Sequence, residues 1–156
     1  MRLKIVRDLT PEEVEQKIKS FERLFDTSFD KFQELFLKQK LNSKFTAAYY
    51  EWADLVDSYK GYVEGGELNY TVEEFEDFRP EQAALLTAKR MELLHQLASP
   101  RVDSISDLSR KVKRNVKNVY QDLEVLKGLG FVRLSRRRGR ALVPETPVKE
   151  ITFLIS

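Results

Sequence analysis

Residues 104–130 read SISDLSRKVKRNVKNVYQDLEVLKGLG, and this stretch decides the fold of the C-terminal half. Ser104 followed by Asp107 fits a capping box that opens a short helix, with Asp in place of the usual Glu. Residues 113–115 predict a turn, after which a second helix is expected. Its inward positions have helical spacing and are Val116, Val119, Leu123 and Leu126. Gly130 suits the left-handed residue that closes such a helix. Two helices around a short turn are typical of a helix-turn-helix.

The segments on either side extend this pattern. Residues 80–98 predict a helix in two pieces, with Thr87 capping the second piece. Residues 131–134 and 140–143 predict two short strands around a basic turn. A final strand is expected where apolar residues alternate, at Ile151, Phe153 and Ile155. Three helices followed by a basic hairpin are the order of elements in a winged helix-turn-helix.

Two amphipathic helices are expected in the N-terminal half. Residues 11–40 carry an apolar stripe with helical spacing, which residues 26–28 interrupt because their side chains compete for backbone donors. A second stripe covers residues 45–62, so the two helices form an antiparallel hairpin. A short strand is then favoured by the alternation of Leu68, Tyr70 and Val72. A capping box at residues 71–74, opening a short helix, is the alternative.

The helical hairpin carries more aromatic surface than two helices can bury by themselves. We therefore expect its stripe to meet the rest of the chain, a second copy of the chain or another protein. The residues predicted to form a partner or dimer surface are Phe25, Phe29, Phe32, Phe36 and Trp52. An ordinary hydrophobic core is the alternative interpretation of the same residues.

Together these segments predict an α+β fold that is mainly helical with a small β wing. Residues 1–66 are expected to form an acidic, aromatic-rich helical arm, which dimerises or binds a partner. Residues 67–79 are expected to form a connecting strand or linker. Residues 80–156 are expected to form the winged helix-turn-helix domain.

The charges of the chain are unevenly distributed. Residues 1–79 hold 12 basic and 17 acidic side chains, whereas residues 80–156 hold 15 basic and 8 acidic ones. Within residues 101–140 the excess of basic side chains reaches 12 against 4. Such asymmetry indicates an acidic module attached to one that meets a polyanion. A solvated charged surface is the alternative, since 33% of all residues are charged.

The polar face of the second helix of the helix-turn-helix indicates what the polyanion is. Its members follow one another at spacing i, i+3, i+4, i+7 and are Arg114, Lys117, Asn118 and Gln121. This face holds no carboxylate, and its forked and amide groups are those that pair with guanine and adenine edges. At the tip of the hairpin the predicted phosphate or minor-groove contacts are Arg136, Arg137, Arg138 and Arg140.

The composition excludes several classes of chemistry, and for others the chain lacks the required set of residues. The chain has no Cys, so disulfides, thiolate metal sites and cysteine nucleophiles are absent. His95 is the single His, and it has no second His to share a metal. No apolar run is long enough for a membrane span or a signal peptide, so a cytoplasmic protein is expected. We expect no enzyme activity and no cofactor.

Four stretches resemble MarR-like winged helix-turn-helix regulators: LLTAKRMELL (85–94), SISDLSRKV (104–112), KNVYQDL (117–123) and LKGLGFV (126–132). Among these, the chain is similar to a prokaryotic, often archaeal, group of predicted transcriptional regulators that includes antitoxins of toxin–antitoxin pairs. The resemblance covers roughly residues 74–146. It implies a DNA-binding homodimer with residues 114–121 in the major groove and the arginine-rich wing beside it. The N-terminal arm departs from the group, because it is longer and more aromatic.

The main hypothesis is a dimeric, sequence-specific regulator of transcription that binds double-stranded DNA as a repressor and controls its own promoter. Its acidic arm would dimerise or bind a cognate toxin. Replacing Arg114 or Asn118 by Ala is expected to cost about 1–3 kcal/mol at a specific site. The alternatives are a winged helix that docks an acidic protein partner, or an RNA-binding protein, neither of which reads a DNA sequence.

Overall fold

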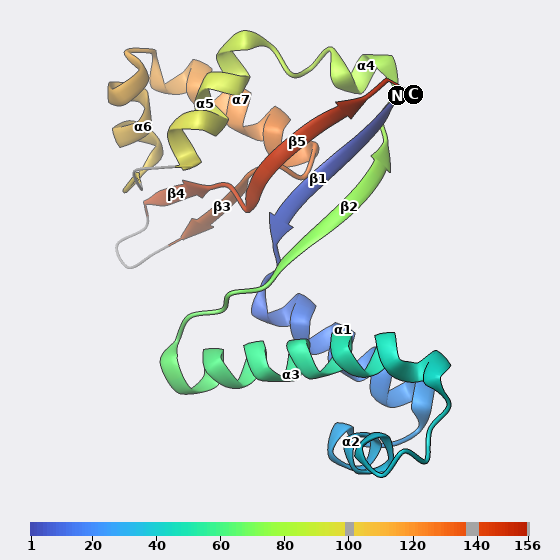
Figure 1. Ribbon diagram of the computed structural model, residues 1–156. Helices are drawn as coiled ribbons and strands as arrows, with labels where there is room; N and C mark the ends of the chain where they lie inside the picture. The colour runs from blue at the N-terminus through green and yellow to red at the C-terminus, as the bar shows by residue number, and fades with distance from the viewer. Residues whose placement is uncertain (99–101, 137–140, 156) are drawn as a thin grey trace. The chain divides into compact units, whose positions relative to one another are not determined.

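The computed structural model describes residues 1–98, 102–136 and 141–155 (Figure 1). The chain divides into two compact units. Unit 1 comprises residues 1–7 and 72–156, and unit 2 comprises residues 8–71. In chain order, unit 2 is therefore an insertion within unit 1. None of the helices in the described part of the chain is both long and apolar enough to cross a membrane.

A three-stranded sheet in unit 1 changes the predicted boundaries. Its strand order is β2 (Thr71–Asp77), β1 (Arg2–Asp8), β5 (Val148–Leu154). Residues 1–7, expected in the helical arm, belong to this sheet, and the expected linker at 67–79 contains its edge strand. The physical reason lies in Leu3 and Ile5, which are 0% and 3% exposed and pack in the core of unit 1. The strand favoured at residues 68–72 over a capping box is present as β2, but it begins only at Thr71 and continues to Asp77.

Both neighbours of β1 run antiparallel to it. Leu3 lies opposite Phe153 and Ile5 opposite Ile151, so apolar side chains share one face of β1 and β5. Met1 and Phe78 exchange two hydrogen bonds between their backbone groups, of 3.0 and 2.7 Å, beside β2. Such a reciprocal pair is the pattern of antiparallel strands. β1 is thus the central strand of the sheet.

The helices and the hairpin of unit 1 follow the predicted order. They are α4 (Pro80–Ala83), α5 (Ala88–Ala98), α6 (Ile105–Val112), α7 (Val116–Gly128), β3 (Arg133–Arg136) and β4 (Leu142–Glu145). The break before α5 is confirmed, because the Thr87 hydroxyl accepts a hydrogen bond from the Arg90 backbone N–H at 3.3 Å. The two hairpin strands lie two residues later than predicted, with Arg133 opposite Glu145. The predicted α+β class is confirmed.

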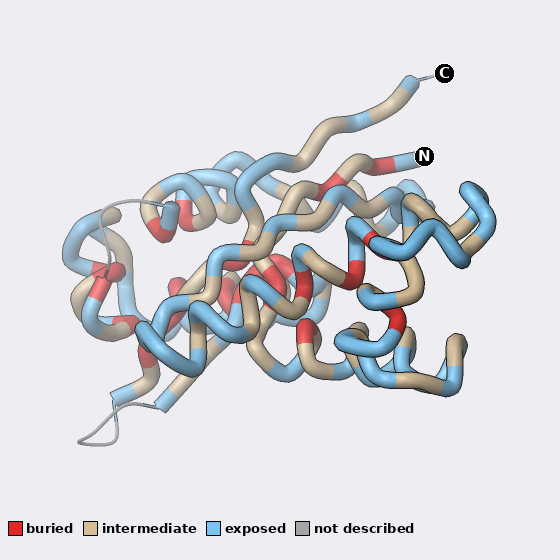
Figure 2. The backbone as a smooth tube through the Cα atoms, turned by 60° about the horizontal axis from the view of Figure 1, so that its bottom comes forward, coloured by how far each residue is buried: buried red, intermediate tan, exposed pale blue. Residues whose placement is uncertain are grey.

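One hydrophobic core joins the helices of unit 1 to its strands. Leu93, Leu108, Leu123 and Leu126 are fully buried, and they come from α5, α6 and α7. The Phe131 ring, 1% exposed, stacks on the Phe78 ring at a centroid distance of 5.8 Å. Buried positions recur between exposed ones along the helices and strands (Figure 2). This packing fixes α6 and α7 against α5, which defines the helix-turn-helix as a rigid element.

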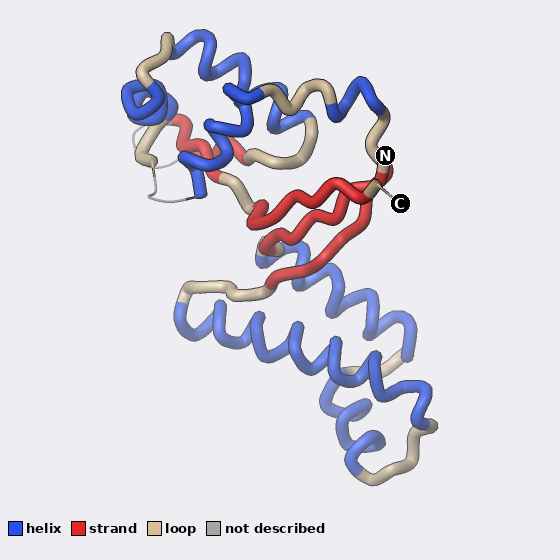
Figure 3. Tube along the Cα trace, turned by 45° about the horizontal axis from the view of Figure 1, so that its top comes forward, coloured by secondary structure: helices blue, strands red, loops and turns tan. Residues whose placement is uncertain are grey.

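Unit 2 is helical, and Figure 3 shows its helices in blue. Its elements are α1 (Pro11–Phe25), α2 (Phe29–Leu37), a 3₁₀ turn (Ser43–Phe45) and α3 (Thr46–Gly65). The break expected at residues 26–28 is confirmed. Asp26 ends α1 in the left-handed conformation with φ 50°, and the Ser28 hydroxyl caps α2 by accepting a hydrogen bond from the Lys31 backbone N–H.

The aromatic residues of unit 2 form its own core, which corrects the predicted partner surface. Trp52 and Phe32 are 0% and 3% exposed, and their ring centroids lie 5.1 Å apart. The half-buried residues packed around them include Phe25, Phe29 and Phe36. The expectation treated residues 11–40 as one side of a two-helix hairpin. The break after α1 instead makes α2 a separate helix, and three helices bury what two cannot.

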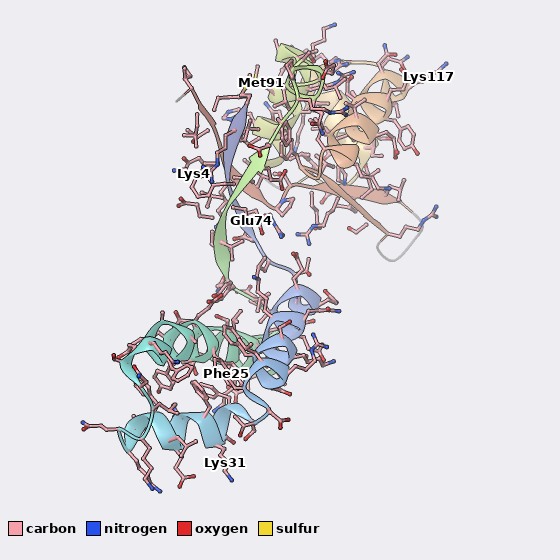
Figure 4. All side chains as sticks on the ribbon, turned by 90° about the vertical axis from the view of Figure 1, so that its right-hand side faces the viewer. Lys4, Phe25, Lys31, Glu74, Met91 and Lys117 are labelled. Carbon is pink, nitrogen blue, oxygen red and sulfur yellow. The ribbon has the colours of Figure 1, made fainter. Side chains whose placement is uncertain are left out.

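Figure 4 shows the side chains of both units, including Phe25 among the helices of unit 2 and the exposed Lys31 on α2. The Phe25 ring lies 4.6 Å from Phe32 and 6.0 Å from Trp52 by centroid distance. Aromatic pairs at such distances add about 0.5–1.5 kcal/mol beyond their buried area. The arm is therefore a folded module with a dense aromatic interior.

Candidate nucleic-acid interface

The turn between α6 and α7 is fixed by three local features. The Ser104 hydroxyl caps α6 by accepting a hydrogen bond of 3.0 Å from the Asp107 backbone N–H. Lys113 ends α6 in the left-handed conformation, with φ 55°. The Asn115 side-chain oxygen caps α7 by accepting a hydrogen bond of 2.8 Å from the Lys117 backbone N–H. The short connection and its caps give the geometry of a helix-turn-helix.

Three of the four residues predicted to read bases are exposed on the first two turns of α7. These are Lys117, Asn118 and Gln121, and Figure 4 shows Lys117 projecting outward from the helix. On the opposite side of α7, Val119 and Leu123 are 0% exposed. We call the set Lys117, Asn118 and Gln121 the reading face. Its side chains supply ammonium and amide groups, and no carboxylate.

Three further residues of α7 are exposed beside the reading face, and one of them, Glu124, carries a carboxylate. Tyr120 is 41% exposed, and Val116, which the spacing placed inward, is 46% exposed. Val116 is the first residue of the helix. A tyrosine hydroxyl can bond a phosphate, and an apolar side chain can contact a thymine methyl group. Tyr120 lies outside the prediction, because a phenol is neither a forked nor an amide group.

Arg114 does not lie on α7, which corrects its predicted place on the second helix of the helix-turn-helix. α7 begins at Val116, so Arg114 lies in the turn, where helical spacing does not apply. Its Nη2 atom donates a hydrogen bond of 2.6 Å to Oδ2 of Asp122, and its side chain is 17% exposed. Its Nη1 atom is buried and has no hydrogen-bond partner in the described residues. The guanidinium is therefore turned toward α7 and away from solvent.

Asp122 receives a second guanidinium from α5. The Arg90 Nε atom donates to Oδ1 of Asp122 at 3.0 Å, and Arg90 Nη1 donates to the Leu85 carbonyl at 2.9 Å. Burial raises the pKa of the Asp122 carboxyl, but the hydrogen bonds and charges of Arg114 and Arg90 outweigh burial, so this pKa lies below its ordinary value. Asp122 is thus an ionised link between α5, α7 and the turn.

A second carboxylate near the turn is also paired. Asp107 accepts a hydrogen bond from the Asp103 backbone N–H at 3.0 Å, and it lies 3.5 Å from the Lys111 ammonium group. The backbone hydrogen bond from Asp103 and the nearby charge of Lys111 hold the pKa of Asp107 below its ordinary value. Both acids close to the helix-turn-helix turn are therefore neutralised by partners within unit 1.

A polar hollow of about 480 Å³ opens beside the reading face. Its lining residues come from α7, the turn and the start of α5, and they are Thr87, Lys89, Arg114, Asn115, Asn118, Gln121 and Asp122. The structure thus brings Arg114, Asn118 and Gln121 together, while Lys117 lies outside the lining. Thr87 and Lys89 were not predicted, because their contribution depends on the packing of α5 against α7.

The basic hairpin is described in part. Arg136 ends β3 and is exposed, as is Arg133 at the start of the same strand. The other predicted wing contacts, Arg137, Arg138 and Arg140, lie outside the described residues. The hairpin therefore presents at least two guanidinium groups on one strand.

Within the described ranges, no group of three or more His, Cys, Asp and Glu side chains lies close enough to hold a metal ion. His95 is exposed on α5 and lines a shallow hollow with Met91 and Ile151.

A family model described as HVO_A0114 matches residues 85–153 of the chain. The matched region includes α5, α6, α7 and the hairpin, and it is less than half of the chain. No curated protein and no solved structure gives a significant match. The resemblance to MarR-like regulators stays a prediction.

Proposed function

We propose that this protein is a sequence-specific regulator of transcription that binds double-stranded DNA, with α7 in the major groove. One observation carries the proposal: the reading face exposes Lys117, Asn118 and Gln121 at the start of α7, while the carboxylate of Asp122 beside them is paired with Arg114. Asn and Gln side chains pair with adenine edges, and Lys pairs with guanine edges. In a helix-turn-helix protein, the N-terminal residues of the second helix contact the bases.

The basic hairpin supplies sequence-independent affinity in this proposal. Arg136 is exposed at the end of β3, and the sequence continues with further arginines. Arginine contacts to phosphates position a protein on the duplex but do not read its sequence. The division of labour is then base reading by α7 and phosphate binding by the hairpin.

A second copy of the chain is the proposed partner in DNA binding. A palindromic operator has two half-sites, and a dimer with two-fold symmetry matches them. A toxin partner for unit 2 stays a prediction from the resemblance, because the aromatic surplus that motivated it is accounted for by the core of unit 2. A regulator acts where the DNA is, so we propose a cytoplasmic location and a role in binding, not in catalysis.

The proposal is tested by fluorescence anisotropy with the promoter fragment of the protein's own gene and a scrambled duplex of equal length. Asn118→Ala and Gln121→Ala should each weaken binding to the promoter by about 5- to 150-fold, the equivalent of about 1–3 kcal/mol for a lost bidentate base contact. Binding to the scrambled duplex should change little.

Lys127→Ala is the control for these reading-face variants, because Lys127 is exposed near the other end of α7. The control should leave promoter affinity close to that of the parent. If the reading-face variants bind the promoter as tightly as the parent, α7 does not read the bases. Equal affinity of the parent for both duplexes would favour a docking or RNA-binding role, and a single-stranded RNA probe then separates these two.

A further inference from the structure

Asp122 holds two guanidinium groups beside the reading face. Each of its carboxylate oxygens accepts one hydrogen bond, Oδ2 from Arg114 at 2.6 Å and Oδ1 from Arg90 at 3.0 Å. All three side chains are 15–20% exposed. Of the two cations, Arg114 lines the polar hollow together with Asn118 and Gln121, and Arg90 does not. The charged Arg114 guanidinium thus lies next to the groups proposed to read bases.

We propose that Asp122 determines specificity by holding the Arg114 guanidinium away from DNA phosphates. The inference rests on the proposed function, since it concerns the balance between specific and nonspecific DNA binding. Asp122 acts through Arg114, so it is a positioning residue and makes no DNA contact itself.

The physical reason is the nature of phosphate contacts. Each cation that neutralises a phosphate adds affinity for every duplex, and it therefore lowers the ratio of specific to nonspecific binding. A guanidinium binds carboxylate and phosphate with the same forked geometry, so the two anions compete for it. In this structure the Asp122 carboxylate, on the same helix as the reading face, binds the Arg114 guanidinium at hydrogen-bond distance.

Arg114 is the cation that a loss of Asp122 would release. Arg90 keeps a second anchor, the Leu85 carbonyl at 2.9 Å. Arg114 has no other side-chain hydrogen bond in the described residues, and its Nη1 atom lacks a partner even with Asp122 in place. Without the carboxylate, two guanidinium groups would repel each other, and the Arg114 side chain would swing into the hollow.

An opposite role for the same pair is that Asp122 braces Arg114 so that Arg114 reads a guanine. The structure favours restraint over bracing, because Arg114 Nη1 is buried and precedes the helix that carries the reading face. The two roles differ in what Arg114→Ala does. Bracing predicts a loss of promoter affinity, whereas restraint predicts almost none.

The experiment measures Kd against salt concentration for the promoter fragment and the scrambled duplex. Asp122→Asn should bind the scrambled duplex more tightly at low salt, and its slope of log K against log salt should steepen by about 0.9 for one added phosphate contact. The ratio of promoter to scrambled affinity should fall. Asp122→Asn/Arg114→Ala should return the slope to the parental value, because the released cation is gone.

Three controls separate this role from a structural one. Asp122→Glu keeps the charge and should keep the parental slope. Arg90→Gln leaves the pair of Asp122 and Arg114 intact, so it should also keep the slope. Arg114→Ala should leave promoter affinity within about twofold of the parent. Thermal unfolding of every variant, followed by circular dichroism, shows which of them are folded.

The inference is overturned if folded Asp122→Asn has an unchanged or shallower slope, or if Arg114→Ala selectively loses promoter affinity. Should Asp122→Asn fail to fold, Arg114→Ala still decides, because bracing predicts a loss of promoter affinity for this variant and restraint predicts almost none. The proposed function is judged separately, from the parent protein alone, by its preference for the promoter over the scrambled duplex.

Discussion

The guanidinium of Arg7 donates two hydrogen bonds to the carboxylate of Glu74, Nε to Oε2 at 3.1 Å and Nη2 to Oε1 at 3.0 Å. The pair joins β1 to β2 next to the residues between which unit 2 is inserted. Both side chains are partly exposed, 22% for Arg7 and 34% for Glu74. The forked geometry makes this one of the stronger kinds of ion pair.

We expect Glu74→Gln to destabilise unit 1 by roughly 1 kcal/mol or less, because solvent screens a partly exposed pair. A double-mutant cycle with Arg7→Ala, measured by urea unfolding, isolates the coupling between the two side chains. Lys19→Ala, which removes a more exposed ion pair with Glu15, is the matched control and should be close to neutral. A coupling energy of zero would show that the pair does not secure the strands.

The aromatic core of unit 2 predicts a large effect for Phe32→Ala. Phe32 is 3% exposed and packs against Trp52, so its truncation should cost about 3–5 kcal/mol in stability of unit 2. The chain has one Trp, so Trp52 fluorescence during denaturant unfolding reports on unit 2. Val63→Ala, at a 67% exposed position of α3, is the control and should be nearly silent. An unchanged midpoint for Phe32→Ala would rule out the aromatic core.

Substitutions at Asn115, which caps α7, are expected to change stability and DNA affinity in different directions. Asn115→Asp keeps an oxygen that can accept from the Lys117 backbone N–H, and a negative charge is favourable at a helix N-terminus. We expect unchanged or slightly higher thermal stability but weaker binding to both duplexes, because the new carboxylate lies in the polar hollow. Asn115→Ala should instead lose about 1 kcal/mol of stability. Equal DNA affinity of the Asp variant and the parent would place the duplex elsewhere.

The lowered pKa of Asp122 predicts how stability depends on pH. An aspartate in an unfolded chain has a pKa of about 4. The pKa of Asp122 in the folded protein lies below this value. The stabilisation is therefore fully present above the unfolded pKa, and it is lost as the pH falls through the folded pKa. Urea unfolding of the parent and of Asp122→Asn across this acidic range should show their difference shrinking as pH falls. A difference that stays constant would mean that Asp122 is not the titrating group.

Removing the exposed Arg136 side chain of the hairpin is expected to lower the affinity for every duplex, whatever its sequence. Arg136→Ala should weaken binding to promoter and scrambled duplex by similar factors, and it should reduce the salt slope by about 0.9 if one phosphate contact is lost. Arg23→Ala on α1 removes the same charge from an exposed site in unit 2 and serves as the control. A loss confined to the promoter would instead indicate base reading by Arg136.

Local signals in the sequence predicted the helix-turn-helix well. The cap at Ser104, the cap at Thr87 and the left-handed Gly130, with φ 84°, are each set by neighbouring residues. β1 was missed because Leu3 and Ile5 form a brief alternation whose partner strand begins at Val148. Strand pairing over such a separation leaves no local signal.

The candidate site was predicted in part, and the error at Arg114 has a clear cause. Helical spacing was extended backwards from Asn118 through a turn, where the backbone no longer follows the helix. The ion pair of Arg114 with Asp122 depends on that turn geometry. Likewise, the predicted partner surface assumed that two helices bury the aromatic residues of unit 2. The sequence did not show that the break at Asp26 makes α2 a third helix.

The place of β1 in the sheet has a consequence for the order of folding. Unit 2 draws its internal contacts from one continuous segment, so it can fold as soon as residues 8–71 have left the ribosome. β1, made earlier, has to wait for β5, whose pairing residues begin at Val148. The unit proposed to bind DNA is therefore completed last, although its central strand is synthesised first.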